Sequence, residues 1–546
     1  ELIGVADQFI KEDDRPPGLA CMIGTCYFLK KKKTKNDLFL ALKYFEEAYL
    51  KDNKSIHGLS AVSNFMNVSA VAAKTSDEFL PDILKAEKYY FETEKHFGNN
   101  INFLIAAQRL FWFQLNNKIL KNISEKLIAN PQTPLIEKSG NIFFQNYIYN
   151  WSQKEYTKHA IINSKNIPKY KSKNLKELKL YENEKIHLGF VSSDFTDQHS
   201  IFYFLKDTLK YLDRKIFKIF LFSFNRKQNN YWLGQKEIKS VADEFIDLEN
   251  YDNQECINII QGNKINILLD IMGFSFTKRI PIFNVRVAPV QISWLATCNT
   301  TGIDNIDYLI ADQNLISENE ENQYPEKILK LPNIWNAHCG YDLNRKFNSA
   351  PCETKDYFTF GSLNNFHKIS DETVEVWSKI LTKCEKSTLI LKSASFECNI
   401  DKIKEKFKKF GVEKKIKILN KKKYPYKKDH LEVYKDIDLA LDTFPYNGVA
   451  TTFEALWKGV PVNVLKGHNF NSRCGYSILK NSTFENLISK NIDEYVEKAV
   501  YFYNNRKEFL ALREKIFKNV LSTPLYDTKN FSKNFGQSLL NILNKN

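Results

Sequence analysis

The spacing of hydrophobic residues changes once along this chain, and that change limits what the chain can fold into. Over roughly the first 175 residues, hydrophobic side chains recur three or four positions apart, most clearly in the segment 38–50, as amphipathic helices require. After a charged stretch at 171–184, short apolar runs alternate with helix-like segments. This alternation is typical of α/β domains. The sequence therefore predicts an α-helical N-terminal region followed by α/β domains.

Part of the helical region has the pattern of a tetratricopeptide unit. The matching positions are Gly24, Tyr27, Ala41, Phe45 and Ala48. The match requires five extra residues around 30–35 in the turn between two helices, and Ala86 and Tyr90 would mark a second, degraded unit. An ordinary helical hairpin, whose small residues let the helices pack closely, explains the pattern equally well. We expect a tetratricopeptide-like region.

Ten apolar runs are predicted to be strands, in two successive series. The first series is 186–191, 216–224, 265–271, 290–295 and 308–311. After a polar break near 344–356, the second is 358–361, 388–392, 416–419, 439–441 and 462–465. Two series of similar size predict two doubly wound domains facing a cleft, with ligands at the carboxyl ends of the strands. The expected domains are residues 1–175, 176–350 and 351–546.

Composition excludes other classes of protein. A chain of 546 residues is too long for one core, and its 14% aromatic content excludes wholesale disorder. The net charge is +15, but only about ten of the 79 basic residues are Arg. A lysine-rich solvated surface therefore explains the charge better than a polyanion-binding surface, although the latter stays open. We do not expect nucleic acid as a partner.

Cysteine usage and the N-terminus favour a cytoplasmic protein. The nine Cys residues include no Cys-x-x-Cys pair, and their odd number favours reduced thiols. The first residues lack the basic flank and apolar run of a secretion signal, and no run of 18 apolar residues occurs, so we expect no membrane span. The chain begins with Glu instead of Met, which leaves open whether residues precede it.

The most informative segment begins at residue 439 and reads Leu-Ala-Leu-Asp-Thr-Phe-Pro-Tyr-Asn-Gly-Val-Ala-Thr-Thr-Phe-Glu-Ala-Leu-Trp. It predicts a strand ending at Asp442, a turn, and a helix with Thr451 and Thr452 in its first turn. Backbone N–H groups and hydroxyls at a helix N-terminus form an anion site, which suits a nucleotide diphosphate. Glu454, one turn further along, could accept hydrogen bonds from a ribose. A capped helix after a strand is the structural alternative.

This segment closely resembles the O-GlcNAc transferase/SPINDLY family of protein O-glycosyltransferases, and further blocks resemble it in the correct order from about residue 186 to 540. These blocks are Gly189-Phe-Val-Ser-Ser-Asp-Phe, Val287-Ala-Pro-Val-Gln-Ile-Ser-Trp-Leu, Phe360-Gly-Ser-Leu-Asn-Asn-Phe-His-Lys-Ile, His430-Leu-Glu-Val-Tyr, Asn471-Ser-Arg-Cys-Gly and Thr523-Pro-Leu-Tyr-Asp-Thr-Lys-Asn-Phe. The resemblance implies a GT-B architecture, with two Rossmann-like lobes of which the second holds a nucleotide sugar, often preceded by tetratricopeptide helices.

The resemblance also implies roles for individual residues. Lys368 takes the place of the family's essential lysine, a compact charge suited to a diphosphate leaving group. Asn365 matches a phosphate contact, and His430 matches a residue near the nucleobase. His199 aligns, with one inserted residue, with a histidine that acts as base or positions the acceptor. A solvated lysine and a helix-capping histidine are the structural alternatives.

Some positions depart from the family pattern and leave the donor open. Phe274 replaces a histidine found in many relatives, and at the phosphate-binding helix this chain has Val449-Ala450-Thr451-Thr452 where animal-type enzymes have His-Thr-Thr. Glu454 and Asn299-Thr-Thr-Gly lean toward the SPINDLY branch, which implies GDP-fucose. UDP-GlcNAc is the default expectation, as a substrate and not a cofactor. We expect no metal site, because the triplet Asp436-Ile-Asp438 directly precedes a strand of a matched block.

The expected function is that of an inverting, metal-independent glycosyltransferase that moves a sugar from a nucleotide sugar to Ser or Thr hydroxyls of proteins. The helical region would help to present the protein acceptor. One alternative is a glycosyltransferase with a glycan or lipid-linked acceptor. Another is a scaffold that has lost catalysis and binds partners through its helices. The acceptor and the oligomeric state are not indicated by the sequence.

Overall fold

The chain is described by a computed structural model in which most residues are placed. The described residues are 11–134, 137–138, 142, 145–147, 149–172, 181–197, 199–224, 233–276, 278–341, 345–392, 399–419 and 427–544. They belong to two compact units, Glu1–Asn141 with Ala394–Lys409, and Ile142–Ser393 with Phe410–Asn546. The three-part division at residues 175 and 350 stays a prediction. No helix within the described ranges is both long enough and apolar enough to cross a bilayer.

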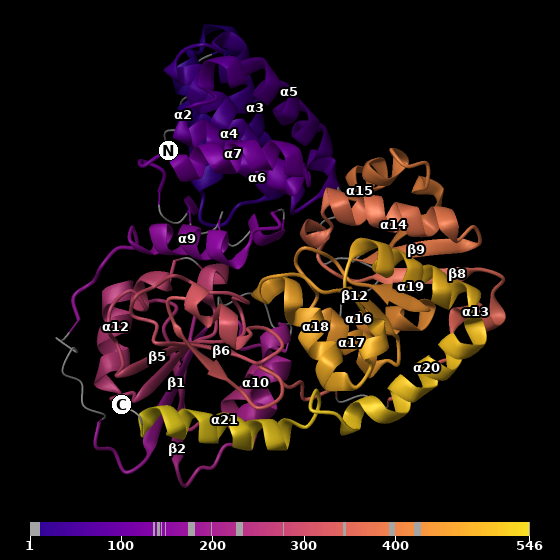
Figure 1. Ribbon diagram of the computed structural model, residues 1–546. Helices are drawn as coiled ribbons and strands as arrows, with labels where there is room; N and C mark the ends of the chain where they lie inside the picture. Colours follow the sequence, from indigo (N-terminus) through magenta and orange to yellow (C-terminus); the bar gives the residue numbers. More distant parts are fainter. Residues whose placement is uncertain are drawn as a thin grey trace. The chain divides into compact units, whose positions relative to one another are not determined.

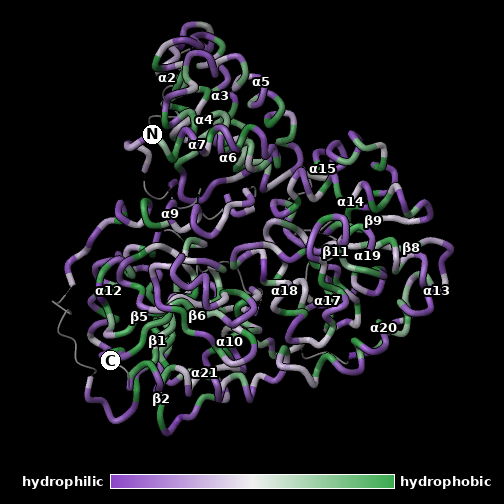
Figure 2. Tube along the Cα trace, viewed as in Figure 1, coloured by the Kyte–Doolittle hydropathy of each residue, from purple (hydrophilic) through white to green (hydrophobic). Residues whose placement is uncertain are grey.

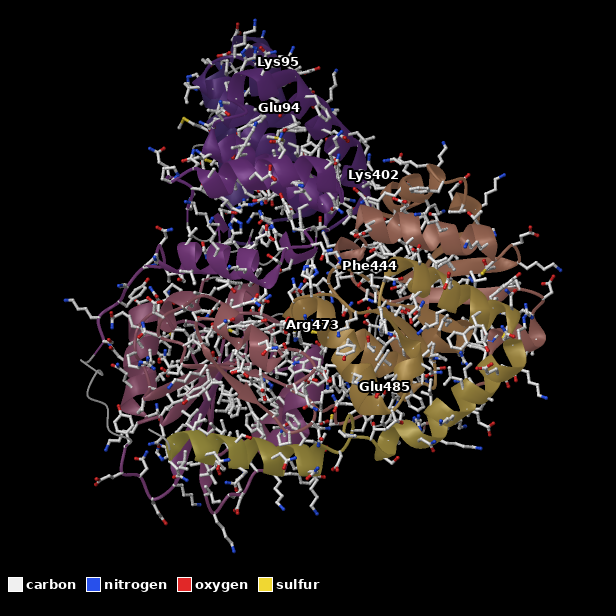
Figure 3. The ribbon with its side chains drawn as sticks, viewed as in Figure 1. Glu94, Lys95, Lys402, Phe444, Arg473 and Glu485 are labelled. Carbon is white, nitrogen blue, oxygen red and sulfur yellow. The ribbon has the colours of Figure 1, made fainter. Side chains whose placement is uncertain are left out.

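The first unit is built from helices alone in its described part (Figure 1). Its helices are α2 (Pro17–Leu29), α3 (Lys35–Lys51), α4 (Ile56–Ala73), α5 (Leu80–Phe97), α6 (Ile101–Phe113), α7 (Asn117–Ala129) and α15 (Asn399–Lys408). Although α15 comes much later in the chain, Lys402 on it forms an ion pair of 3.9 Å with Glu87 on α5 (Figure 3). The N-terminal region is helical, as the hydrophobic spacing predicts.

The tetratricopeptide-like segment forms the hairpin of α2 and α3. Thr34 ends the turn and caps α3 in a reciprocal arrangement with Asp37, which explains where the second helix starts. A Cβ at Gly24 would lie 3.0 Å from Phe45 and 3.1 Å from the carbonyl of Ala41. The two helices therefore pack so closely that α2 needs a glycine at this crossing, which agrees with the predicted role of the small residues.

The second unit contains two parallel sheets. The first, in the order β3-β2-β1-β4-β5-β6-β7, is that of a Rossmann-like fold with one added strand. Its strands are β1 (Ile186–Ser192), β2 (Phe217–Ser223), β3 (Glu244–Asp247), β4 (Ile267–Asp270), β5 (Val290–Ser293), β6 (Tyr308–Ala311) and β7 (Lys327–Lys330). Hydrophobic residues concentrate along the central strands (Figure 2). Its helices are α9 (Gln153–Ser164), α10 (Ser200–Lys210), α11 (Leu233–Ser240) and α12 (Asn253–Gly262).

The second sheet repeats this topology in the order β10-β9-β8-β11-β12-β13. Its strands are β8 (Phe358–Ser362), β9 (Ser387–Lys392), β10 (Ile416–Leu419), β11 (Leu439–Leu441), β12 (Val462–Leu465) and β13 (Ile488–Ser489). The accompanying helices are α13 (Pro351–Thr354), α14 (Asp371–Lys383), α16 (Lys427–Glu432), α17 (Ala450–Trp457), α18 (Phe470–Ser482), α19 (Ile492–Asn504) and α20 (Arg506–Asn519), and the last helix, α21 (Thr528–Leu543), packs on the first lobe. Two Rossmann-like lobes after a helical region confirm the predicted GT-B fold class.

All ten predicted strands are present, and three strands of the structure were not predicted. These three are β3, β7 and β13, and each lies at the edge of its sheet. Glu244–Asp247 and Lys327–Lys330 are exposed or half-buried along their length. An edge strand needs no continuous apolar run, so its sequence lacks the signal by which buried strands are found.

The two lobes are joined by polar contacts and by the last helix. Arg473 on α18 donates to both carboxylate oxygens of Glu320, at 2.6 and 2.7 Å (Figure 3). Ser477 on the same helix donates to Asp312 at 2.6 Å. Helix α21 crosses back to the first lobe, where the Ser532 hydroxyl donates to the carbonyl of Thr208 at 2.7 Å. These contacts place the carboxyl edges of the two sheets in one compact unit.

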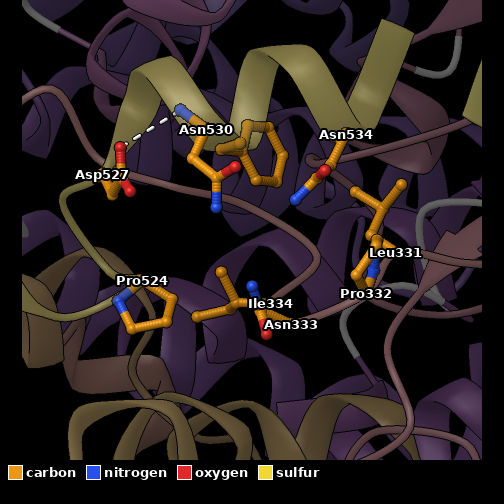
Figure 4. Close-up of a pocket in the computed structure, with 9 residues that line it drawn as sticks. Leu331, Pro332, Asn333, Ile334, Pro524, Asp527, Asn530 and Asn534 are labelled. Atoms are coloured by element: carbon orange, nitrogen blue, oxygen red, sulfur yellow. Dashed lines mark hydrogen bonds between the residues drawn. The ribbon is translucent and has the colours of Figure 1, made fainter. Parts of the chain in front are cut away.

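A small pocket lies where α21 begins, between its first turns and the segment that follows β7 (Figure 4). The side chain of Asp527 caps the helix there by accepting the N–H of Asn530 at 3.1 Å. None of the residues for which the sequence predicts a functional role lines this pocket.

Candidate functional site

The polar side chains of interest gather at the carboxyl edge of the second sheet. Strands β9, β8 and β11 are neighbours there, and Lys392, Asn364 and Asp442 stand at or just after their carboxyl ends. Ligands of doubly wound sheets bind at this edge. A small pocket lies at this edge and is lined by Asn364, Asp442 and Thr451 among others. This edge is therefore the candidate site.

Asp442 organises the turn between β11 and α17. One of its carboxylate oxygens accepts the N–H groups of Thr443 at 2.9 Å and Gly448 at 2.7 Å, and the Asn364 amide at 3.3 Å. A side chain at position 448 has no room, because a Cβ there would lie 2.3 Å from the Thr451 hydroxyl. Burial raises the pKa of the Asp442 carboxyl to about 7. A titratable group thus sits within the site.

Lys368 ends the short 3₁₀ helix Phe366–Lys368 and reaches toward the same turn. Its ammonium donates to the carbonyl of Asn447 at 3.0 Å and lies 4.4 Å from the ring centre of Tyr446. Burial lowers the pKa of this ammonium, and the negative charge of Asp442 partly opposes that shift. A cation in such a poorly solvated place attracts an anionic group more strongly than a surface lysine would.

The N-terminus of α17 points into the same site. No side chain caps the helix at Val449. The Thr451 hydroxyl donates to Asn364 at 3.0 Å, whereas the Thr452 hydroxyl is buried and donates back to the carbonyl of Gly448 at 3.1 Å. The first-turn N–H groups and the helix dipole favour an anion here. Together with Lys368, the helix end can hold a diphosphate.

Glu454 and His430 meet one turn further along α17. The carboxylate of Glu454 is 1% exposed, and one of its oxygens lies 2.9 Å from His430 Nε2 and 3.0 Å from the Tyr434 hydroxyl. The Tyr434 hydroxyl also lies 3.1 Å from the carbonyl of Thr451. The structure therefore connects the predicted ribose acceptor and the predicted nucleobase contact to the diphosphate end of the site.

The chain matches one family model over both lobes. The model is described as glycosyl transferase family 41, and it matches residues 155–340 and 351–535, which is more than half of the chain. The chain belongs to glycosyl transferase family 41. This confirms the resemblance to O-GlcNAc transferases and SPINDLY that the sequence motifs carry.

The relatives match 64–66% of this chain and are much longer than it is. A probable UDP-N-acetylglucosamine–peptide N-acetylglucosaminyltransferase SPINDLY of Solanum lycopersicum is 30% identical over 361 residues, 64% of this chain and 37% of that protein. The SEC protein of Arabidopsis thaliana, with the same probable activity in its name, is 27% identical over 374 residues, 66% of this chain and 37% of that protein. The chain thus spans about 37% of the length of these relatives.

Among solved structures, an O-GlcNAc transferase mutant of Thermobaculum terrenum has the same fold as this family member. The two superpose with a TM-score of 0.77 and 19% identity, over 96% of this chain and 97% of that one. At this identity the likeness shows the fold alone.

The structure brings most of the predicted site residues of this family 41 member into one network. Five of them lie on or contact the turn after β11 and helix α17, namely Lys368, Thr451, Thr452, His430 and Glu454. Asn365 lies at the start of the 3₁₀ helix that carries Lys368, where its side chain accepts the N–H of His367 at 3.1 Å. Their predicted roles toward a ligand stay predictions.

His199 lies on the other lobe, at the N-terminus of α10. Its Nδ1 accepts the N–H of Ile201 at 3.4 Å, which is the helix-capping arrangement that the sequence left as an alternative. Because Nδ1 accepts this hydrogen bond, a neutral ring carries its proton on Nε2. In that state Nε2 can donate a hydrogen bond to the hydroxyl of a substrate, but it cannot remove the proton of that hydroxyl. The predicted role of His199, as base or in positioning the acceptor, stays a prediction.

One departure from the family pattern, Phe274, and one member of the Asp-Ile-Asp triplet, Asp438, have a clear structural setting. Phe274 is 2% exposed and follows Gly273, which has a positive φ of 51° and whose Cβ would lie 1.8 Å from the Thr297 hydroxyl. Phe274 therefore fills core space beside a tight turn. Asp438 of the Asp-Ile-Asp triplet is buried and accepts the N–H groups of Cys352 and Thr359 at 3.0 and 2.7 Å. Its carboxylate thus anchors β8 and α13.

Sequence reasoning missed three residues of the site, Asn364, Lys392 and Asp442. Asn364 stands beside the predicted Asn365, but it is the buried member of the pair and the one that contacts Thr451. The sequence predicts that Asp442 ends a strand, but it indicates no function for this residue. Lys392 ends an apolar run and has the sequence of an ordinary strand terminus. Only the position of Asp442 after β11 could have signalled a role, because ligands bind at that edge.

The two threonines of α17 are expected to differ in importance. Thr451→Val should raise the KM for the nucleotide-sugar donor about fivefold, because a hydrogen-bonding hydroxyl at the phosphate end is lost. Thr452→Val should leave this KM within about twofold of wild type and lower the melting temperature instead, since its hydroxyl bonds to the helix's own turn. Donor titration and thermal melting of both variants test this. An equal KM change in the two variants would contradict it.

Proposed function

We propose that the chain is an inverting glycosyltransferase that moves a sugar from a nucleotide sugar to Ser or Thr hydroxyls of proteins. The observation that carries this proposal is the half-buried Lys368 ammonium beside the uncapped N-terminus of α17. Both features favour negative charge at one place. A nucleoside diphosphate leaving group develops that charge when the bond to the sugar breaks.

The proposed reaction is a single displacement. The oxygen of the acceptor hydroxyl forms a bond to the anomeric carbon of the sugar while the bond from that carbon to the diphosphate breaks. The hydroxyl proton leaves to a base or to water, and the electron pair of the broken bond stays on the diphosphate. Lys368 and α17 would stabilise this charge, and His199 on the facing lobe would position the acceptor. No metal ion is assigned to this step.

GlcNAc is the default sugar of the proposal. Its support is that the names of the SPINDLY and SEC relatives give UDP-N-acetylglucosamine as donor and a peptide as acceptor. GDP-fucose is a second candidate donor because Glu454 and Asn299-Thr-Thr-Gly resemble the SPINDLY branch. The structure gives Asn299 a place at the junction of the lobes, where its amide lies 3.3 Å from that of Asn471.

The test is a transfer assay with each donor. Purified protein is incubated with UDP-GlcNAc or with GDP-fucose and a mixture of cellular proteins, and mass spectrometry locates any added sugar. The proposal expects an added mass on Ser or Thr with one donor, unchanged by a chelator of divalent cations. Donor turnover without any modified protein would favour a non-protein acceptor. Calorimetry that finds no binding of UDP or GDP would favour a scaffold without catalysis.

A further inference from the structure

Two cysteines from different lobes meet beside the candidate donor site. Cys298 follows β5 of the first lobe, and Cys474 lies on α18 of the second. Both side chains are buried, at 7% and 0% exposure, and the two thiols are hydrogen-bonded to each other. Their neighbours also touch, since the amide of Asn299 donates to the side-chain oxygen of Asn471 on α18 at 3.3 Å. Because the two cysteines lie far apart in the chain, no spacing in the sequence indicates this pair.

The thiol pair lies next to the groups that hold Lys368. The Tyr446 hydroxyl donates to the Cys298 sulfur, and the Lys368 ammonium lies 4.4 Å from the centre of the Tyr446 ring. On α18, the N–H of Gly475 donates at 3.2 Å to the side chain of Asn447, whose carbonyl accepts the Lys368 ammonium. Both cysteines therefore contact or adjoin residues that support this ammonium.

The two thiols differ in reactivity. The hydrogen bond from Cys474 lowers the pKa of the Cys298 thiol, burial opposes this shift, and the positive charge of Lys368 adds to it. Burial raises the pKa of the Cys474 thiol. Because the thiolate is the nucleophile in thiol oxidation, Cys298 reacts first and Cys474 is the neighbour that completes a disulfide. Lys368 is only half-buried, so the pair is not sealed from a molecule as small as hydrogen peroxide.

We propose that Cys298 and Cys474 are an oxidation site, at which a peroxide converts the two thiols into a disulfide that joins the lobes and slows sugar transfer. The Cys298 sulfur attacks one oxygen of the peroxide, the O–O bond breaks, and the released hydroxide takes up the thiol proton to form water. The Cys474 sulfur then attacks the resulting sulfenic acid, the S–S bond forms, and the hydroxyl group leaves with the Cys474 proton as a second water. The peroxide is reduced by the two electrons that the sulfur atoms lose.

A disulfide at this place should act on Lys368. Its sulfur atoms are about 2 Å apart, closer than two hydrogen-bonded thiols, so α18 and the segment after β5 must move toward each other. Tyr446 and Gly475 adjoin the pair and support the turn that holds Lys368, so this movement displaces the ammonium from the diphosphate. Because a displacement of about 1 Å can lower a rate about 100-fold, we expect kcat to fall at least about tenfold. This expected fall rests on the proposed function, whereas formation of the disulfide does not.

Mass spectrometry of the full chain after treatment with hydrogen peroxide tests for the bond. The inference expects the loss of two hydrogen atoms and a linked peptide that contains both cysteines, and dithiothreitol should restore both thiols. The linked peptide must be absent in Cys298→Ala and Cys474→Ala, whereas Cys384→Ala, which removes another buried thiol of the second lobe, should still form it. Free thiols at both positions in wild type, or a sulfinic acid at Cys298 without a linked peptide, overturn the inference.

Transfer rates with UDP-GlcNAc and GDP-fucose test the effect on the reaction. Wild type and Cys384→Ala should lose at least about tenfold in kcat on oxidation and recover it with dithiothreitol. Cys298→Ala, which lacks the reacting thiol, should keep the rate that it has before treatment. A linked wild-type protein with an unchanged rate overturns the inference. A wild-type protein that transfers neither sugar before oxidation overturns the proposed function, while the peptide analysis still decides whether the disulfide forms.

Discussion

Lys368→Met is expected to lower the rate of sugar transfer at least about 100-fold, the size of effect seen when one group that stabilises transition-state charge is removed. The expectation follows from the place of the ammonium, which is half-buried, donates to the carbonyl of Asn447 and has a lowered pKa. The charge on a diphosphate grows as the sugar leaves, so kcat should fall more than donor affinity does. Initial rates at saturating donor measure this.

The control for Lys368→Met is Lys379→Met on α14. Lys379 is exposed and pairs only with Glu375 on its own helix among the described residues, so its loss should leave the rate unchanged. Removing a poorly solvated ammonium should not lower the melting temperature of Lys368→Met, because burial of that charge costs free energy. Equal rates in the two variants would show that Lys368 does not act on the diphosphate. A lost rate with a collapsed melting transition would assign it to folding instead.

The sequence predicts the central strands of both lobes because each is a continuous apolar run. Val290–Ser293 and Leu439–Leu441 are buried at every position, which is the pattern that a parallel sheet covered on both faces demands. Glu244–Asp247 is not buried at any position, so nothing in its composition separates it from a loop. The position of a strand can therefore be predicted from the sequence where every residue of the strand is buried.

The chemical state of the site could not be predicted in the same way. The Asp442 carboxyl accepts a hydrogen bond from the amide of Asn364, which lies 78 positions away in the chain. Lys392 contacts His430, which lies 38 positions away. These residues come together only because the crossover connections of the sheet place their strands side by side. A residue's neighbours set its pKa and its tautomer, so the family motifs could name Lys368 and His430 but not the groups that control them.

Asp442 should make donor binding dependent on pH near neutrality. Burial raises the pKa of its carboxyl to about 7. The side chain of Asn364 bridges this carboxyl and the Thr451 hydroxyl at the phosphate end. Its charged form repels a diphosphate, whereas its protonated form does not. Affinity should therefore be highest below pH 7 and fall as the pH rises through that value. If the bound diphosphate raises this pKa by about one unit, the fall is about tenfold.

Asp442→Asn is the variant that isolates this carboxyl. An asparagine keeps an oxygen for the N–H groups of Thr443 and Gly448 but cannot ionise. UDP-GlcNAc is the suitable probe, because its diphosphate is esterified at both ends and does not titrate near pH 7, whereas free UDP does. Calorimetric titrations at pH 6, 7 and 8 should show affinity falling about tenfold in wild type and nearly constant affinity in Asp442→Asn. A fall of the same size in both proteins would contradict the assignment of the pH dependence to Asp442.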